Sequence, residues 1–413
     1  MKKDNMKKNI IWNTIGVFTL SLTSFVYSFV LARFCSLSIT GVWSYAFALA
    51  CTMATLASFG GRTFQVTDSK NELSTYTYVS SRYTSVFIVL ILSIFFIIIK
   101  NFDVNKSLII ISLCVFKFFE ELSDVYYGIL QKHDKLYIVG KSLFFKSIIN
   151  IILFMVSILF IKKLLPAVIL ILINNALFFM FYDRKSALKE EYIEKKFIKN
   201  EYIKYFKNNL MICLILFMAT YLVNCPKYVM ANYLSNELQG IFNILVLPAT
   251  AITLIGTFII NPLLVDISKY YKNGDIKQIK KISYKIISII FLVGVIGVIL
   301  AILIGNPIYK LVFNFNLSSY MKEFIIIIFG CIFYTITMVL TSILITTRNL
   351  FSQLICNFML LFISYVICNI FIKKYGIIGA AYAYLITMLI RFIIYTYFVI
   401  KIKEGKNEKK QNS

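Results

Sequence analysis

The stretch NNLMICLILFMATYLVNCPKYVMANY, from Asn208 to Tyr233, is apolar enough to enter a lipid bilayer, yet it contains Asn224, Pro226 and Lys227. A charged side chain at mid-membrane costs about 3 kcal/mol on insertion scales, so it is seldom placed there without a function. Pro226 lacks a backbone N–H and clashes with the preceding turn, which predicts that the helix kinks or opens near Asn224. A broken, cationic membrane helix predicts a water-filled cavity that receives an anion.

The composition indicates a membrane protein. The chain of 413 residues is 59% hydrophobic and 16% aromatic, which exceeds the apolar content of soluble domains. A net charge of +24 would indicate nucleic acid in a soluble protein. Here the lysines lie in short loops between apolar runs, so no nucleic-acid partner is expected.

Twelve apolar windows reach the length of about 20 residues that a membrane span needs. They lie at 10–33, 39–60, 79–99, 107–130, 138–161, 164–182, 208–233, 240–262, 283–305, 323–346, 350–372 and 376–400. The fold class predicted is an all-α polytopic membrane protein, with twelve transmembrane helices in two six-helix lobes around a central cavity.

The polar segment 183–207 separates the two sets of six windows. We expect an N-terminal lobe over 1–182, a cytoplasmic amphipathic linker over 183–207, a C-terminal lobe over 208–400 and a basic cytoplasmic tail over 401–413. The linker is either a helix lying at the membrane surface or a solvated segment.

Loop charge predicts the topology. If the N-terminus is cytoplasmic, thirty lysines and arginines, Arg82 among them, lie at or beside loops on that face, against nine on the other. The positive-inside rule therefore predicts that both termini are cytoplasmic.

The window 107–130 carries Lys117, Glu120, Glu121 and Asp124 at spacings that place them on one stripe of a helix. Lipid would leave these groups unsatisfied, so the stripe must face protein or a cavity. In one interpretation it lines a cavity, and Glu120, Glu121 or Asp124 binds a coupling ion, H⁺ or Na⁺. In the other, Lys117 forms an intrahelical ion pair with Glu120 or Glu121.

An anionic headgroup that crosses a low-dielectric core needs countercharge. The candidates for a cationic substrate-binding cavity are Lys227, Lys117, Arg33, Lys146 and Arg391, with Asn224 beside the first of them. Arg33, Lys146 and Arg391 lie near the ends of their windows, so snorkelling to an interface is an alternative for each.

Pro226 and Pro248 are candidate hinges, with a static kink as the alternative. The chain has no glycine-rich phosphate loop, no catalytic pair and no zinc-ligand spacing. We therefore expect a protein that is not an enzyme and that has no metal and no cofactor.

A weak internal repeat relates the two halves. Gly41-Val42-Trp43 begins the second window, and Gly240-Ile241-Phe242 begins the eighth with the same order of glycine, apolar and aromatic residues. Parallel repeats of this kind are common in transporters, where the substrate site lies between the halves.

Several short motifs, in order along the whole chain, carry a family resemblance. They are Leu31-Ala32-Arg33, Gly41 to Ala46, the set Glu121, Asp124, Tyr127, Gly128 and Gln131, the set Asn224, Pro226, Lys227 and Tyr228, and Tyr375 to Ala381. With these motifs the chain resembles the Wzx-type flippases of lipid-linked oligosaccharides. These form part of the polysaccharide-transport branch of the multidrug/oligosaccharidyl-lipid/polysaccharide (MOP) exporter superfamily.

The resemblance implies alternating access of two lobes in the bacterial cytoplasmic membrane, driven by an ion gradient. The substrate would be an undecaprenyl-pyrophosphate-linked oligosaccharide among the membrane lipids, and the partners a polysaccharide polymerase and glycosyltransferases. A multidrug/cation antiporter of the same superfamily is one alternative, and it should have an acidic cavity. A lipid II flippase is another, often with two extra spans. A membrane glycosyltransferase or polymerase would need a large extracytoplasmic loop, which the windows do not leave.

Overall fold

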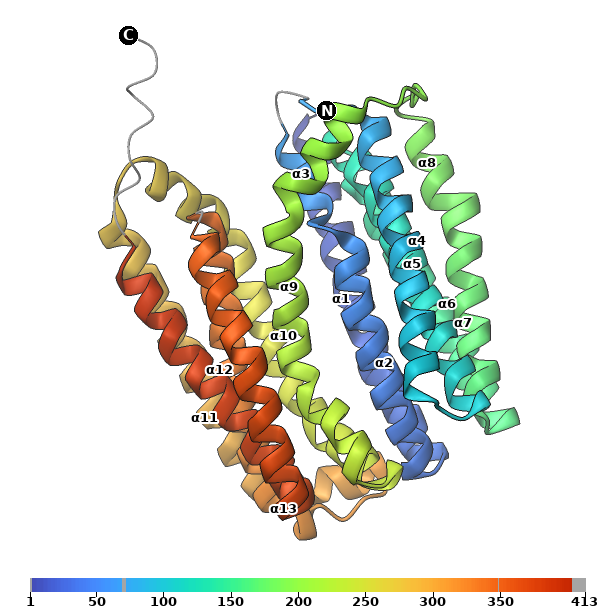
Figure 1. Cartoon of the computed structure of the whole chain (residues 1–413), viewed down its shortest axis with the longest axis vertical. Helices are drawn as coiled ribbons and strands as arrows, with labels where there is room; N and C mark the ends of the chain where they lie inside the picture. The colour runs from blue at the N-terminus through green and yellow to red at the C-terminus, as the bar shows by residue number, and fades with distance from the viewer. Residues whose placement is uncertain (1, 69–71, 348, 403–413) are drawn as a thin grey trace. The chain divides into compact units, whose positions relative to one another are not determined.

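The computed structural model describes residues 2–68, 72–347 and 349–402, and these residues form only helices and the loops that join them (Figure 1). The helices up to the polar segment are α1 (Lys2–Phe34), α2 (Leu37–Ser58), α3 (Gly61–Thr67), α4 (Thr75–Lys100), α5 (Val104–Lys132), α6 (Leu136–Ile161), α7 (Leu164–Phe178), the π-helix η1 (Phe179–Asp183) and α8 (Arg184–Leu188). The later helices are α9 (Lys199–Tyr233), α10 (Asn236–Lys272), α11 (Ile276–Phe313), the 3₁₀-helix η2 (Leu317–Tyr320), α12 (Met321–Thr346) and α13 (Leu350–Ile400). The predicted all-helical class is confirmed.

The chain divides into two compact units, and each has its own interior. Unit 1 comprises Met1–Thr220 and Asn236–Gly240, and unit 2 comprises Tyr221–Ser235 and Ile241–Ser413. The division falls within α9 and near the start of α10. The charged residues discussed below therefore belong to two separate environments.

Polar residues at the ends of the apolar runs begin and end the helices. Four N-cap side chains accept a hydrogen bond from the backbone N–H three residues later, which satisfies one of the free donors of a helix start. These are Ser36, Ser74, Asp103 and Asp275. Four helices end at a residue in the left-handed conformation, namely α2 at Phe59, α4 at Asn101, α6 at Lys162 and α11 at Asn314.

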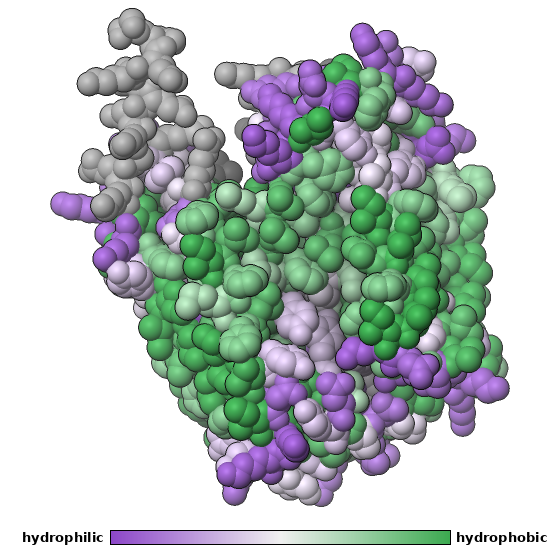
Figure 2. Space-filling view, in the orientation of Figure 1, coloured by the Kyte–Doolittle hydropathy of each residue, from purple (hydrophilic) through white to green (hydrophobic). Residues whose placement is uncertain are grey.

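Ten helical segments among the described residues are long and apolar enough to cross a membrane, so the chain is a multi-pass membrane protein. They are Met6–Phe34, Leu37–Ser58, Thr75–Lys100, Leu136–Ile161, Leu164–Leu188, Lys199–Tyr233, Asn236–Gly256, Ile276–Phe313, Leu317–Thr346 and Leu350–Ile400. Large apolar side chains on their outer faces are exposed, among them Phe160, Ile98 and Leu303. Figure 2 shows such hydrophobic residues over the middle of the helices and hydrophilic residues near their ends.

Two features explain why the structure has ten candidate spans among the described residues, whereas the sequence predicted twelve. Helix α5 covers the window 107–130 with 29 residues, but its charged stripe makes it too polar to qualify on composition alone. Helix α13 covers both 350–372 and 376–400, and Gly376 interrupts it with φ 65° and ψ −133°. A residue with a side chain is strained at such a φ, so glycine allows the chain to change direction where the second window begins.

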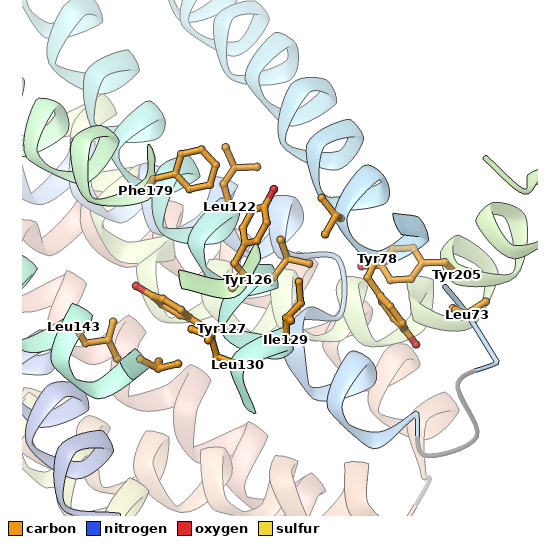
Figure 3. Close-up of a cluster of buried hydrophobic side chains, with 14 residues drawn as sticks. Leu73, Tyr78, Leu122, Tyr126, Tyr127, Ile129, Leu130, Leu143, Phe179 and Tyr205 are labelled. Carbon is orange, nitrogen blue, oxygen red and sulfur yellow. The ribbon is translucent and has the colours of Figure 1, made fainter. Parts of the chain in front are cut away.

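The core of unit 1 joins distant parts of the chain through aromatic rings. Figure 3 shows Tyr78 of α4 and Tyr205 of α9 lying together, with ring centroids 5.9 Å apart at 85°. The Tyr205 hydroxyl donates to the carbonyl oxygen of Phe59 at 3.2 Å, which ties the start of α9 to the end of α2. Aromatic pairs at such angles are favourable beyond the area that they bury.

The glycines of the internal repeat meet in space. A Cβ on Gly41 would lie 1.8 Å from the carbonyl oxygen of Asn236, and a Cβ on Gly240 would lie 2.0 Å from that of Leu37. Each glycine thus packs on the carbonyl four residues before the other. The starts of α2 and α10 therefore approach closely enough for backbone to touch backbone, as small residues permit between membrane helices.

The expectation of one helix over 183–207 is wrong. Helix α8 ends at Leu188, residues 191–198 are not helical, and α9 begins at Lys199. The solvated alternative is also incomplete, because acids of this segment bind back to unit 1. Glu190 pairs with Lys135 at 2.5 Å, and Glu191 binds the Thr75 hydroxyl and His133. These tertiary contacts explain why the segment is not helical in spite of its helical propensity.

Candidate functional site

The acids of α5 each face a basic side chain of unit 1. Lys117 Nζ lies 2.8 Å from Glu120 Oε2, so the intrahelical interpretation holds for this pair. Glu121 Oε2 instead lies 2.7 Å from Arg82 Nη1 of α4. Asp124 lies 3.9 Å from the same guanidinium and 3.7 Å from Arg62 Nε. The stripe therefore faces basic side chains of unit 1, which is one of the two arrangements that its sequence allows, and each of its acids lies near a positive charge.

The short helix α3, which the sequence analysis missed, positions Arg62. The chain turns from α2 into α3 through Gly60 and Gly61, both with positive φ. Gln65 then donates from Nε2 to the carbonyl oxygen of Val125 on α5 at 3.1 Å. Its side chain fills the space over Gly128, where a Cβ would lie 2.1 Å from Gln65 Oε1. These contacts hold α3 against α5 and place Arg62 beside the acidic stripe.

Arg82 was placed wrongly by the loop-charge analysis, which assigned it to a cytoplasmic flank. It lies two turns inside α4 and is only 1% exposed. A guanidinium presents a planar fork of donors, which suits it to bridge two carboxylates. The signal available in the sequence was the excess of acids over cations in 107–130, which required a basic partner from another helix.

Replacing Arg82 with glutamine is expected to destabilise the protein by about 3–5 kcal/mol, because Glu121 would keep its charge without a partner. Thermal unfolding of the purified protein in detergent measures the change. The double variant Arg82→Gln/Glu121→Gln removes both charges and should recover at least half of the lost stability. An unchanged unfolding temperature for the single variant would show that the pair contributes nothing.

A second buried charge pair lies where α5, α6 and η1 meet. Lys146 Nζ is 3.3 Å from Asp183 Oδ2, and both side chains are almost completely buried. The hydroxyls of Tyr127 and Ser142 also donate to this carboxylate. Asp183 is the last residue of the π-helix η1, a conformation frequent at functional sites. Snorkelling, the alternative for Lys146, is therefore wrong, and Asp183 is a site residue that the sequence analysis read as part of the linker.

Asparagines connect the two charge clusters of unit 1. Asn174 Nδ2 donates to the backbone carbonyl of Lys146 at 3.3 Å and to Asn150 Oδ1 at 2.8 Å. Asn150 Nδ2 donates to Asn175 Oδ1 at 2.9 Å, and Asn175 Nδ2 lies 3.5 Å from Glu120 Oε1. A polar chain thus runs through the interior of unit 1 from Asp183 to the acidic stripe. Hydrogen bonds in such chains strengthen one another at low dielectric.

The other predicted cations, Lys227 and Arg391, lie in unit 2. Lys227 is half-buried on α9, and its Nζ donates to Asn243 Oδ1 of α10 at 3.4 Å. Arg391 is 1% exposed on α13 and lies over the Tyr395 ring, 5.0 Å from its centroid. No carboxylate of the described residues lies within 4.0 Å of Arg391, and its Nε has no hydrogen-bond partner among them. Snorkelling is thus wrong for Arg391 as well.

The remaining predicted residues occupy simpler positions. Arg33 is exposed in the last turn of α1, where snorkelling accounts for it.

Asn224 is half-buried one turn before Lys227 on α9. Helix α9 continues through the buried Pro226, so the helix does not open there. Pro248 lies half-buried inside α10.

A carboxylate outside the membrane spans organises the start of α4. Asp68 accepts hydrogen bonds from the backbone N–H groups of Glu72 and Leu73 and from the Tyr78 hydroxyl. Burial alone would raise the pKa of Asp68, but these hydrogen bonds and Lys132 outweigh it and lower the pKa. A lowered pKa means that this carboxylate stabilises the fold at neutral pH, and that the contribution is lost as the pH falls through the pKa.

Comparisons of sequence and of fold identify known proteins that are similar to this chain. No protein-family model matches the chain. The capsular polysaccharide biosynthesis protein CapF of Staphylococcus aureus is 26% identical over 402 residues, which cover 96% of this chain and 100% of CapF. The lipid II flippase MurJ in an inward closed conformation matches the fold with a TM-score of 0.66 and 18% identity, over 95% of this chain and 88% of MurJ. An inward-facing MATE multidrug transporter of the MOP superfamily matches with a TM-score of 0.68 and 13% identity, over 95% of this chain and 97% of the transporter.

The fold is that of the MOP-superfamily membrane transporters. The similarity to CapF, a capsular polysaccharide biosynthesis protein, over 96% of this chain agrees with the family resemblance read from the sequence motifs.

Proposed function

We propose that the protein is a flippase that moves undecaprenyl-pyrophosphate-linked oligosaccharide repeat units across the bacterial cytoplasmic membrane for surface polysaccharide synthesis. The observation that carries the proposal is the similarity to CapF over 96% of this chain and the whole of CapF. The polymerase and the glycosyltransferases of the same synthesis would be its partners.

The distribution of charge supports an anionic substrate. Unit 1 contains four interior acids, Glu120, Glu121, Asp124 and Asp183, and each lies near a lysine or arginine. In unit 2, Lys227 and Arg391 lie within membrane helices, and Arg391 has no carboxylate within 4.0 Å among the described residues. A buried cation of this kind favours an anion such as a pyrophosphate, because it is costly to leave uncompensated.

The proposed mechanism is alternating access of two six-helix lobes, with twelve spans in all. The count is reached if α5 crosses the membrane with its charges facing protein, and if the two parts of α13 on either side of Gly376 each cross it. Both termini would then be cytoplasmic by the positive-inside rule. Pro226 and Pro248 are the proposed hinges, in α9 and α10.

The coupling ion would bind at the acidic stripe of α5. Protonation or sodium binding at Glu121 or Asp124 would weaken the pairing with Arg82, so ion occupancy would alter the contact between α4 and α5. The free-energy cost of charging or neutralising a buried carboxylate is large enough to shift the equilibrium between the two states of alternating access.

Glu121→Gln or Asp124→Asn is expected to make transport insensitive to an imposed proton or sodium gradient, because the amide binds neither ion as a carboxylate does. Transport into proteoliposomes with and without each gradient measures the effect. Glu323→Gln, at the start of α12, is a control that should keep the dependence. Unchanged gradient dependence in both α5 variants would mean that these acids only stabilise the fold.

Reconstitution tests the function itself. Purified protein in liposomes should expose an undecaprenyl-pyrophosphate-linked oligosaccharide to a soluble lectin or glycosidase at least about ten-fold faster than empty liposomes. Lipid II and a cationic drug, tested in parallel, represent the lipid II flippase and the multidrug/cation antiporter. Faster movement of either of these than of the oligosaccharide lipid would replace the proposed substrate.

A further inference from the structure

We propose that the segment between α8 and α9 anchors the protein to the headgroups of anionic phospholipids. This segment, residues 189–199, is called the basic strap below. It joins two segments that are long and apolar enough to cross a membrane, Leu164–Leu188 and Lys199–Tyr233. It crosses the end of unit 1 at which α4 begins (Figure 1). The proposal does not depend on which substrate the protein transports.

The charges of the basic strap point in two directions. Glu190 and Glu191 are half-buried and bind Lys135 and His133, which lie between α5 and α6. The lysines of the strap are all exposed, whereas only one of its acids, Glu194, is exposed. These lysines are Lys189, Lys195, Lys196 and Lys199. The outer side of the strap is therefore positively charged, and such a surface attracts anionic lipids.

The contacts of the strap with α4 place it at the level of the lipid headgroups. Glu191 accepts a hydrogen bond from the hydroxyl of Thr75, the first residue of α4. Thr75 precedes the apolar window 79–99 by four residues, which is about 6 Å along a helix. Headgroups add about 5–7 Å on each side of the hydrocarbon core. The strap thus lies just beyond the depth at which α4 becomes apolar.

An aromatic ring of the strap lies beside the lipid-facing side of α4. Phe197 is 62% exposed, and its ring centroid is 5.4 Å from that of Tyr202. The Tyr202 hydroxyl donates to Thr84 Oγ1 on α4, and the nearby Phe87 is exposed on the same helix. The Phe197 ring is therefore at the flank of unit 1, where α4 presents apolar side chains to lipid.

The combination of this ring with free lysines favours a membrane surface over a soluble anion. No carboxylate of the described residues lies within 4.0 Å of the ammonium groups of Lys195 and Lys199, which stand on either side of Phe197 in the sequence. Segments that bind anionic membranes combine lysines with large apolar side chains in this way. A soluble anion would contact the lysines alone.

Hydrogen–deuterium exchange of the full-length protein in nanodiscs tests the proposal, with phosphatidylglycerol as the anionic lipid and phosphatidylcholine as the neutral one. Peptides of the strap should exchange about five-fold more slowly in phosphatidylglycerol, because bound headgroups shield backbone N–H groups that are not in a helix. Lys195→Gln/Lys199→Gln should lose at least half of this difference. Lys196 is kept, because its charge also acts on Glu201.

Lys373→Gln/Lys374→Gln is the matched control, because these two lysines are exposed on α13, outside the strap. This variant should keep the full difference between the two lipids. Equal exchange of the strap in both lipids, or an equal loss in the two double variants, would overturn the anchor. Equal protection by millimolar inorganic phosphate in phosphatidylcholine would show a soluble-anion site instead, and would overturn the lipid assignment.

Phe197→Trp tests the position of the ring. The fluorescence that this variant adds to that of Trp12 and Trp43 should be quenched by phosphatidylglycerol that is brominated in its acyl chains. Added fluorescence that only a water-soluble quencher reduces would place the ring in water, and would overturn its part in the anchor.

Discussion

Lys227→Ala is expected to reduce polysaccharide export below the level that complementation detects, while the protein still inserts into the membrane at a normal level. Lys227 is half-buried on α9, and its Nζ donates to Asn243 Oδ1 of α10 within unit 2. A hydrogen bond to a charged group contributes about 1.5–3 kcal/mol, so losing one with the substrate pyrophosphate would reduce transport about 10- to 150-fold. Complementation of an export-deficient strain measures the effect, with membrane levels checked by immunoblot.

Two further variants separate the charge from the fold. Lys227→Arg keeps a cation and should retain part of the activity, although a guanidinium and an ammonium bind phosphate differently. Lys373→Ala removes a lysine that is exposed on α13 and should leave export unchanged. Full export by Lys227→Ala at a normal membrane level would remove this residue from the proposed mechanism.

Gly41→Val is expected to reduce the yield of folded, membrane-inserted protein about ten-fold or more. Its Cβ would lie 1.8 Å from the carbonyl oxygen of Asn236, an atom of the backbone that cannot rotate away. The starts of α2 and α10 would have to separate, and the reciprocal contact of Gly240 with Leu37 would be lost with them. Overpacking costs about 1–3 kcal/mol where side chains can adjust, and more where backbone must move.

Gly297→Ala provides the control for the glycine substitution. Gly297 also lies inside a membrane helix, but a Cβ there would approach only Ile252 at 4.0 Å, an ordinary contact. Alanine is a better helix former than glycine, so this variant should be as stable as the natural protein or slightly more stable. Fluorescence-detected size exclusion in detergent compares the variants, and wild-type behaviour of Gly41→Val would contradict the close backbone contact.

The sequence predicted the fold class and most helix positions because apolar windows report directly on burial in lipid. It also predicted that the stripe from Lys117 to Asp124 must face protein or a cavity, since lipid leaves such groups unsatisfied, and the structure gives each acid a basic neighbour. It did not predict which residues supply the countercharge. Arg82 read as a loop residue, because a hydropathy window cannot distinguish an arginine at a span end from one paired two turns inside.

Local patterns also failed where tertiary contacts decide the conformation. The segment after Asp183 has helical composition, but Glu190 and Glu191 bind the loops of unit 1 and the helix stops. Asp183 itself is the partner of Lys146, a relation between residues 37 apart that no spacing rule reveals. The glycine repeat was visible in the sequence, whereas the direct contact between Gly41 and Gly240 needed coordinates.

The pairing of Arg82 with the α5 acids has a consequence for biogenesis. Each charged residue at the centre of a helix costs about 2.5–3.5 kcal/mol to insert, so α5 with four of them could not leave the translocon into lipid by itself. The ribosome makes Arg62 and Arg82 before Glu121 and Asp124, so α3 and α4 precede the helix that needs them. Helices α4 and α5 should therefore enter the bilayer as a pair, and the insertion machinery would hold the first until the second arrives.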